Sequence, residues 1–251
     1  MAKQRGIIKL EGTIGDITFL RTQDGYLAKE NNPVNGDRIN NDPAFQRTRE
    51  NASEFGRAGK AGKLLRSALR SALQNAKDRR VTSRLVSELM KVIQADSTST
   101  RGQRNVIDGE AELLQGFNFN LNAVLSSMLF APYSSTIDRA AGTLQVNIPA
   151  FVPANMITSP AGSTHFKICA AGCAVDFENG SFESDLKETA ILPLDTNATA
   201  VINLNCAVSA NSTHPLFLTM GIQFYQEVNG SYYSLKDGGF NGLEIVKVSG
   251  E

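Results

Sequence analysis

Three residues of the chain recur at a spacing that could hold a metal ion. His165, Cys169 and Cys173 are four residues apart, which on a helix would place all three on one face. The stretch from residue 165 to 177 is more typical of a strand, where four residues span about 13 Å, too far for one metal ion. We therefore expect these cysteines to pack in a core as small apolar residues.

A second stretch, from Gly56 to Lys63, resembles a phosphate-binding loop because it combines glycines with lysines. Leu64 stands where that motif requires Ser or Thr after the lysine, and no strand precedes the stretch. Glycines at 56, 59 and 62 within a helical composition instead predict either a helix break near residue 59 or backbone packed closely on a neighbour.

Two further patterns are typical of catalytic or calcium sites but are incomplete. Asp108, Glu110 and Glu112 alternate like calcium-loop carboxylates, but the following ligands are missing. The two histidines, His165 and His214, have no Gly-x-Ser-x-Gly nucleophile motif to accompany them. The sequence therefore predicts a protein that is not an enzyme and that has no cofactor or metal site.

The charge distribution is the most informative pattern. The 251 residues contain 25 Lys+Arg and 25 Asp+Glu, a net charge of +0. Residues 1–56 are balanced, residues 57–104 carry +9 (twelve basic, three acidic), and residues 105–251 carry −9 (five basic, fourteen acidic). The net charge of zero is therefore the sum of a basic segment and an acidic segment.

The basic segment has three interpretations. It is a solvated helix surface, a face that meets the acidic part of the next copy, or a nucleic-acid contact. Against nucleic acid, the segment has no interleaved aromatics and no known DNA-binding pattern. The candidate interaction residues are eight cations of the basic helices: Lys60, Lys63, Arg66, Arg70, Lys77, Arg79, Arg80 and Arg84.

The elements that must position these residues follow from periodicity. Residues 6–30 predict short strands with an Asp24-Gly25 hairpin turn. Asp42-Pro43 predicts a helix start, with helices over 44–76 and 81–94. Strands are then predicted at 117–122, 144–148, 165–177, 189–192, 200–208, 216–227, 232–235 and 243–248.

These elements predict an α+β fold: an N-terminal β-hairpin segment and basic helices, followed by an antiparallel β-sandwich. We expect two domains, residues 1–104 and 105–251. With 41% hydrophobic residues the chain can bury a core, and no apolar run approaches the ~20 residues that span a bilayer. The first residues do not have the pattern of a secretory signal, which predicts a cytoplasmic protein, or a particle assembled in the cytoplasm.

Both ends of the chain resemble a family of uncharacterised proteins of Bacteroidota and their phages, a domain of unknown function. The N-terminal likeness is Gly12-Thr-Ile-Gly-Asp-Ile17, Gly25-Tyr26 and Asp42-Pro-Ala-Phe-Gln-Arg47; the C-terminal likeness is the hairpin at 224–235. The family carries no assigned activity, so the resemblance implies no site residues and favours a structural or interaction role.

The leading hypothesis is a structural protein that self-assembles head to tail into a filament, tube or phage-like particle, through the basic helices and the acidic sandwich. The partner is then another copy of the chain, and no membrane is involved. The alternative is a nucleic-acid-associated or packaging protein that uses the helices of residues 57–104. A third class is an enzyme or a carbohydrate-binding sandwich, with Tyr225, Tyr232 and Tyr233 as a sugar platform.

Overall fold

The computed structural model describes residues 1–30, 36–235 and 239–250. By its internal contacts the chain divides into two units, Met1–Arg49 and Glu50–Glu251. The boundary predicted at residues 104 and 105 lies inside the second unit, because the basic helices share a hydrophobic core with the strands that follow them.

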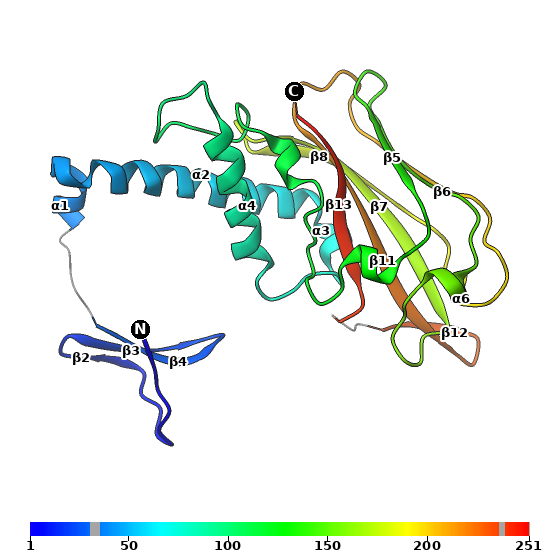
Figure 1. Ribbon diagram of the computed structural model, residues 1–251, viewed down its shortest axis with the longest axis horizontal. Helices are drawn as coiled ribbons and strands as arrows, with labels where there is room; N and C mark the ends of the chain where they lie inside the picture. Colours follow the sequence, from blue (N-terminus) through cyan, green and yellow to red (C-terminus); the bar gives the residue numbers. More distant parts are fainter. Residues whose placement is uncertain (31–35, 236–238, 251) are drawn as a thin grey trace. The chain divides into compact units, whose positions relative to one another are not determined.

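The first unit contains an antiparallel sheet of four strands in the order β1-β4-β3-β2 (Figure 1). Its strands are β1 (Ala2–Lys3), β2 (Gly12–Ile14), β3 (Ile17–Thr22) and β4 (Gly25–Glu30). A short helix α1 (Gly36–Asn41) and a 3-10 turn η1 (Pro43–Phe45) follow, and the Asp42 carboxylate caps the turn by accepting from Ala44 N at 2.9 Å. The short strands, the hairpin turn and the helical start at Asp42 are confirmed.

Three helices open the second unit or lead into it: α2 (Gln46–Ala68), α3 (Arg70–Leu73) and α4 (Val81–Ala95). The predicted break near residue 59 is wrong, because α2 continues to Ala68. The alternative, close backbone packing, holds at Gly62, where a Cβ would lie 3.2 Å from Cδ1 of Leu89 on α4.

Two antiparallel sheets follow the helices and form a sandwich-like arrangement, as predicted (Figure 1). The long strands β7 (His165–Asp176) and β11 (Leu216–Val228) form the centre of the larger sheet. Its outer strands are β8 (Ser181–Glu188) and β9 (Leu192–Pro193) beside β7, and β12 (Ser231–Ser234) and β13 (Gly242–Ser249) beside β11. The smaller sheet contains β5 (Ser134–Asp138), β6 (Thr143–Ile148) and β10 (Ile202–Ala207), in the order β10-β6-β5.

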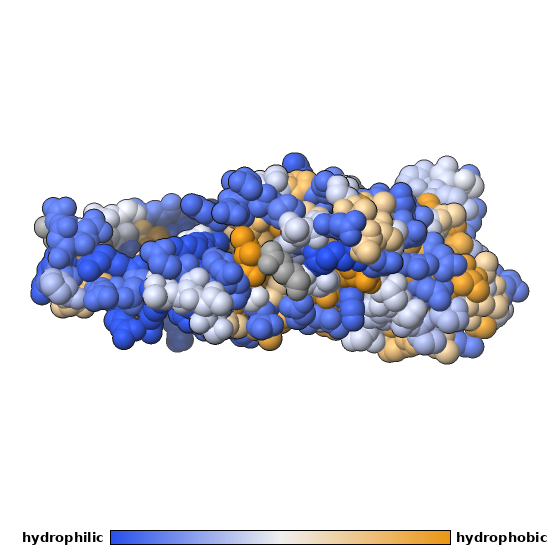
Figure 2. All heavy atoms as spheres, turned by 90° about the horizontal axis from the view of Figure 1, so that it is seen from above, coloured by the Kyte–Doolittle hydropathy of each residue, from blue (hydrophilic) through white to orange (hydrophobic). Residues whose placement is uncertain are grey.

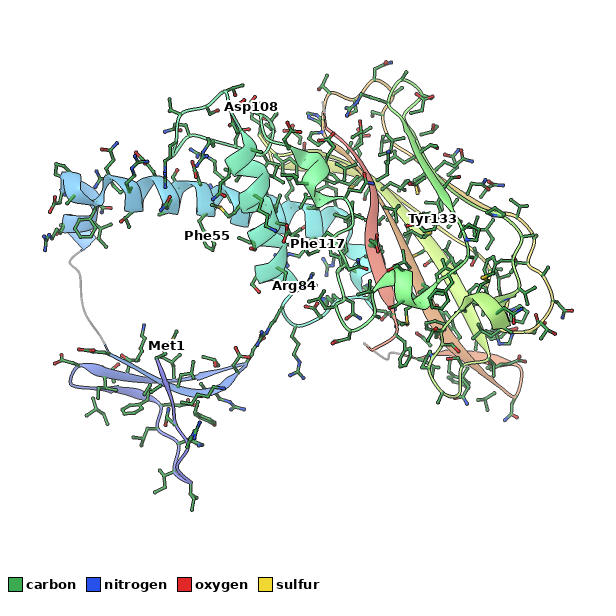
Figure 3. All side chains as sticks on the ribbon, in the orientation of Figure 1. Met1, Phe55, Arg84, Asp108, Phe117 and Tyr133 are labelled. Carbon is green, nitrogen blue, oxygen red and sulfur yellow. The ribbon has the colours of Figure 1, made fainter. Side chains whose placement is uncertain are left out.

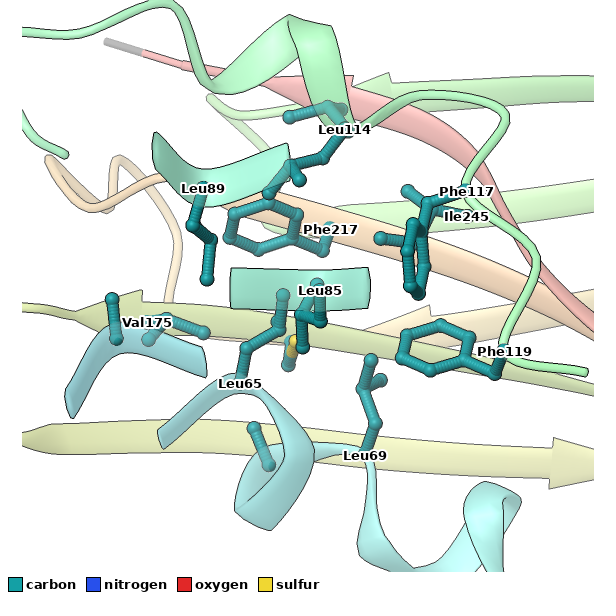
Figure 4. Packing of buried hydrophobic residues seen from close by; sticks show 14 of the residues in the cluster. Leu65, Leu69, Leu85, Leu89, Leu114, Phe117, Phe119, Val175, Phe217 and Ile245 are labelled. Atoms are coloured by element: carbon teal, nitrogen blue, oxygen red, sulfur yellow. The ribbon is translucent and has the colours of Figure 1, made fainter. Parts of the chain in front are cut away.

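The two central strands of the larger sheet, β7 and β11, are buried on both faces over most of their length. The helix-side face of this sheet joins α2 and α4 through one core, in which Leu65, Leu85, Phe119, Phe217 and Ile245 are buried (Figure 4). Its other face packs on the smaller sheet through a second core. Both faces of β7 are therefore apolar, and the chain forms three layers here, namely helices, larger sheet and smaller sheet.

Two predicted strands are wrong. Residues 117–122 alternate but form a loop against β13, where Phe119 N donates to Leu243 O at 2.8 Å. This loop buries Phe117 and Phe119 in the core, but it also buries Asn120, which is 0% exposed, so the alternation of the sequence is not an alternation of burial. Residues 189–192 were also predicted as a strand, but β8 ends at Glu188 and only Leu192–Pro193 pairs with β7.

Candidate interaction site

The eight predicted cations lie on the helices and on the turns between them. Arg66 donates from Nε to Gly62 O at 3.1 Å, and Arg80 has a partner within the chain. Arg84 is described below. The remaining five of the eight cations are exposed, and their side chains have no hydrogen bond or ion pair within the described residues. These five are called the free cations below: Lys60, Lys63, Arg70, Lys77 and Arg79.

Arg84 has an internal role instead. Its Nη2 contacts Asp78 Oδ2 at 2.5 Å, its Nη1 donates to Asn118 O at 2.9 Å, and its guanidinium lies over the Phe117 ring (Figure 3). Burial alone would raise the pKa of Asp78, but hydrogen bonds from Leu121 N and Arg84 outweigh it and lower the pKa. Arg84 therefore joins α4 to the loop of residues 117–121, and we leave it out of the interaction site.

A groove of about 890 Å³ lies beside two of the free cations. One wall is α2, with Lys60, Lys63 and Leu64; the second is the loop of residues 103–108; and the third is the β7–β8 turn, residues 177–180. Its apolar lining includes Leu64, Val106, Ile107 and Phe177, and its acidic lining consists of Asp108 and Glu178. The groove thus combines an apolar surface with cations on one side and carboxylates on the other.

The loop wall is held by an ion pair between α2 and the end of the loop. Glu54 is 1% exposed, and its carboxylate accepts from Arg104 Nε at 2.8 Å, from Arg104 Nη2 at 2.9 Å and from Gly102 N at 2.8 Å. These bonds, the Arg104 side chain first, hold the pKa of Glu54 below its usual value. Three residues along α2, Arg57 Nη1 donates to Gly102 O at 2.6 Å and to Arg104 O at 3.1 Å.

Asp96, just after α4, holds the other side of the same loop. Its Oδ1 accepts from Thr98 N and Ser99 N at 2.8 and 2.9 Å, and its Oδ2 accepts from Asn105 N at 3.1 Å. Burial alone would raise the pKa of Asp96, but these bonds outweigh it and hold the pKa far below its usual range. The loop wall is therefore preorganised before any partner arrives.

The turn wall is held in the same way. Asp176, at the end of β7, accepts from Glu178 N at 3.0 Å and from Asn179 N and Nδ2 at 2.9 and 2.8 Å. These bonds lower the pKa of Asp176, with the Asn179 backbone as the largest cause. The sequence Glu178-Asn179-Gly180 is typical of a turn, and the Asp176 carboxylate anchors it.

The residues that build the groove's walls were missed in the sequence for a physical reason. Glu54, Arg57, Asp96 and Arg104 resemble ordinary helix-surface and loop charges until the fold brings residue 104 beside residue 54. One local signal was available: Asp96-Ser-Thr-Ser99 is the pattern of an aspartate that caps its own following turn.

The remaining candidates do not form a site. His165, Cys169 and Cys173 lie on strand β7 as predicted, the three cysteines of the chain are free and buried, and burial raises the pKa of Cys169 to about 12. The described residues contain no cluster of three or more metal-ligating side chains. The stretch Gly56–Lys63 lies inside α2, so it does not form a phosphate loop after a strand.

The three tyrosines of the proposed sugar platform are divided between two faces. Tyr232 pairs with Glu227, and Tyr233 pairs with Gln226, so the two adjacent tyrosines point to opposite sides of the hairpin. Tyr225 lies on the same side of the hairpin as Tyr232. On that side the His165 and Tyr232 rings meet edge to face, with their centroids 4.8 Å apart.

Figure 2 shows a mainly hydrophilic surface with apolar residues in separate patches. Among the described residues, no helix is both long and apolar enough to cross a membrane. No protein-family model, curated protein or solved structure matches the chain, so the resemblance to the Bacteroidota family stays a prediction.

Proposed function

We propose that this chain is a non-enzymatic structural subunit that self-assembles head to tail into a filament, tube or phage-like particle made in the cytoplasm. The observation that carries the proposal is the N-terminal sheet. Residues 1–30, all of which the structure describes, form four strands without a single buried side chain. A segment of 30 residues buries too little surface to be stable by itself in water, so a covering partner would stabilise it.

One face of this sheet is apolar. Ile14 lies opposite Ile17 and Phe19 lies opposite Ala28, and residues paired in this way share a face. Ile14 is 65% exposed and Ile17 is 46% exposed. A strand face that exposes large aliphatic side chains marks an interaction surface.

The charges on this face suit a second copy of the chain. Arg21 lies opposite Tyr26 at one end of the apolar stripe, and Glu30 lies opposite Ile17 at the other end, about 13 Å away along the strands. When two such faces meet with strand directions reversed, Arg21 of each copy approaches Glu30 of the other. This self-complementarity is what a two-fold contact between identical faces requires.

The division of charge supports a second, head-to-tail contact. The free cations of the helical segment lack partners within the described residues, and residues 105–251 carry the excess of carboxylates. Opposite charges on different parts of a subunit steer association and set its direction. One self-complementary contact and one head-to-tail contact together allow copies to add without limit.

The test is the size of the full chain in solution, measured by size-exclusion chromatography with light scattering and by negative-stain electron microscopy. We expect concentration-dependent oligomers, and we expect Ile17→Glu to weaken association at least roughly 30-fold, the effect of losing one interface hot spot. Association weakens because the introduced carboxylate at position 17 would have to be buried among the apolar side chains of the contact.

Thr18→Glu is the matched control, because Thr18 is adjacent on β3 but points to the opposite face. We expect it to leave the oligomer size unchanged. A monodisperse monomer of the unaltered chain at high concentration, at low and at moderate salt, would overturn the proposal.

The second candidate function is nucleic-acid binding, and the free cations are the observation that favours it. If this function is correct, duplex DNA or RNA will bind with an affinity that falls steeply as salt rises. Replacing Lys60, Lys63, Arg70 and Lys77 by alanine should reduce the slope of log affinity against log salt by roughly 3 to 4. A mobility-shift series checks this, and an unchanged slope would count against the function.

A further inference from the structure

The β11–β12 hairpin ends in an exposed tip with an unusual combination of side chains. Val228, Tyr232 and Tyr233 are 44%, 48% and 59% exposed, and Glu227 is exposed beside them. The tip turns at Asn229 and Gly230, whose φ values of 51° and 79° are those of a tight two-residue hairpin turn. Glu227 and Tyr232 lie on one side of the tip and Val228 and Tyr233 lie on the other, so the tip presents an acidic and an aromatic group on one side and an apolar and an aromatic group on the other.

The tip and the groove lie at opposite ends of the same two strands. Tyr225 of β11 pairs with His165 at the start of β7, next to the hairpin, and Leu216 pairs with Ala174 near the end of β7. The turn that lines the groove follows directly after Asp176. The twelve residues of β7 span about 40 Å, so the tip of one copy cannot reach the groove of the same copy (Figure 1).

The chemistry of the two elements is complementary. The groove offers Lys60 and Lys63, both free cations, to the Glu227 carboxylate. Its apolar lining at Leu64, Val106 and Phe177 suits Val228 and the tyrosine rings. The carboxylates of Asp108 and Glu178 on the far walls can accept from tyrosine hydroxyls.

We infer that the β11–β12 hairpin tip of one copy docks into the groove beside α2 of the next copy. This inference rests on the proposed self-assembly and names its head-to-tail contact. The hairpin tip and the groove lie at opposite ends of β7. A pair of docked copies therefore still has one unfilled tip and one unfilled groove, so further copies can add through the same contact. The preorganised walls, held by Glu54, Asp96 and Asp176, reduce the ordering needed when the tip enters.

Cysteine cross-linking of the full chain tests this contact. The three native cysteines are buried, so introduced surface thiols react selectively with a short bismaleimide. A chain with both Val228→Cys and Lys63→Cys should give a ladder of cross-linked dimers, trimers and higher species in denaturing gels. The matched control pairs Val228→Cys with Thr82→Cys, an exposed site on α4 that does not line the groove, and should give no ladder.

Charge reversal provides the second measurement. Glu227→Lys and Lys63→Glu should each weaken association roughly tenfold or more, and the chain carrying both should regain most of the loss. If the full chain forms oligomers but neither the ladder nor the rescue appears, the hairpin contact is wrong and the proposed function stands. If the unaltered chain stays monomeric, the proposed function fails and this inference fails with it.

Discussion

Replacing Glu54 by alanine is expected to lower the free energy of unfolding by about 3 kcal/mol, the effect of removing one partner from a buried ion pair. Glu54 is almost fully buried, and its loss would leave Nε and Nη2 of Arg104 and the N–H of Gly102 without their acceptor. The loop that forms one wall of the groove would lose its tie to α2. Denaturant unfolding followed by circular dichroism measures the change.

Glu88→Ala is the matched control, because Glu88 is also a helix glutamate with an ion-pair partner. Its pair with Lys91 is at 2.7 Å, but the Lys91 side chain is 61% exposed. Such exposed pairs contribute about 0 to 1 kcal/mol, so we expect a small change. Equal losses for the two variants would contradict the role given to the Glu54–Arg104 pair.

The Glu54 pair also has a pH signature. Because the folded-state pKa of Glu54 lies below its ordinary value, its stabilisation is fully present above the unfolded pKa, about 4.3, and is lost as pH falls through the folded pKa. The difference in stability between the unaltered chain and Glu54→Gln should therefore shrink below about pH 4.3. A constant difference down to pH 2 would show that the ionised carboxylate is not what stabilises the loop.

Replacing Gly142 by alanine is expected to destabilise the fold by about 3 to 5 kcal/mol, from a left-handed backbone angle and from steric overlap. Gly142 has a φ of 67° in the turn between β5 and β6. A Cβ there would overlap Val208 O and lie 2.9 Å from Ala210 N, and both neighbours are backbone atoms. Val208 N also donates to Gly142 O at 2.9 Å, so the two segments cannot separate freely.

Gly180→Ala isolates the backbone part of this effect, so the difference between the two variants gives the steric part. Gly180 has a similar φ of 73°, but nothing lies within 4 Å of its Cβ position. It should therefore show only the left-handed penalty, about 1 to 2 kcal/mol. Midpoints of urea unfolding compare the two variants, and a loss at Gly142 no greater than at Gly180 would rule out the close approach of the 208–210 backbone.

Much of the fold follows from local patterns. The Asp42-Pro43 helix start, the helix over 81–94 and the strands around 144–148, 165–177 and 216–227 are all present, because hydrophobic periodicity and turn residues act over a few neighbours. β8 was missed, since Ser181–Glu188 is a polar edge strand whose burial pattern does not alternate. The loop of residues 117–122 was predicted as a strand because apolar and polar residue types alternate there, although the adjacent residues Phe119 and Asn120 are both buried.

In the candidate site, too, some features follow from the sequence alone and others follow only from the tertiary structure. The sequence by itself determined that the chain has basic helices and an acidic sandwich, because net charge depends only on composition along the chain. It also determined which cations to examine, and Lys60 and Lys63 do line the groove. Only the tertiary structure decided that Arg84 is used internally, that Glu54 holds Arg104, and that the hairpin tip and the groove lie at opposite ends of β7. These facts depend on contacts between residues that are far apart in the sequence, such as Arg84 with Asn118 and Glu54 with Arg104. The spacing of neighbouring residues carries no information about such contacts, because they form only when the chain folds.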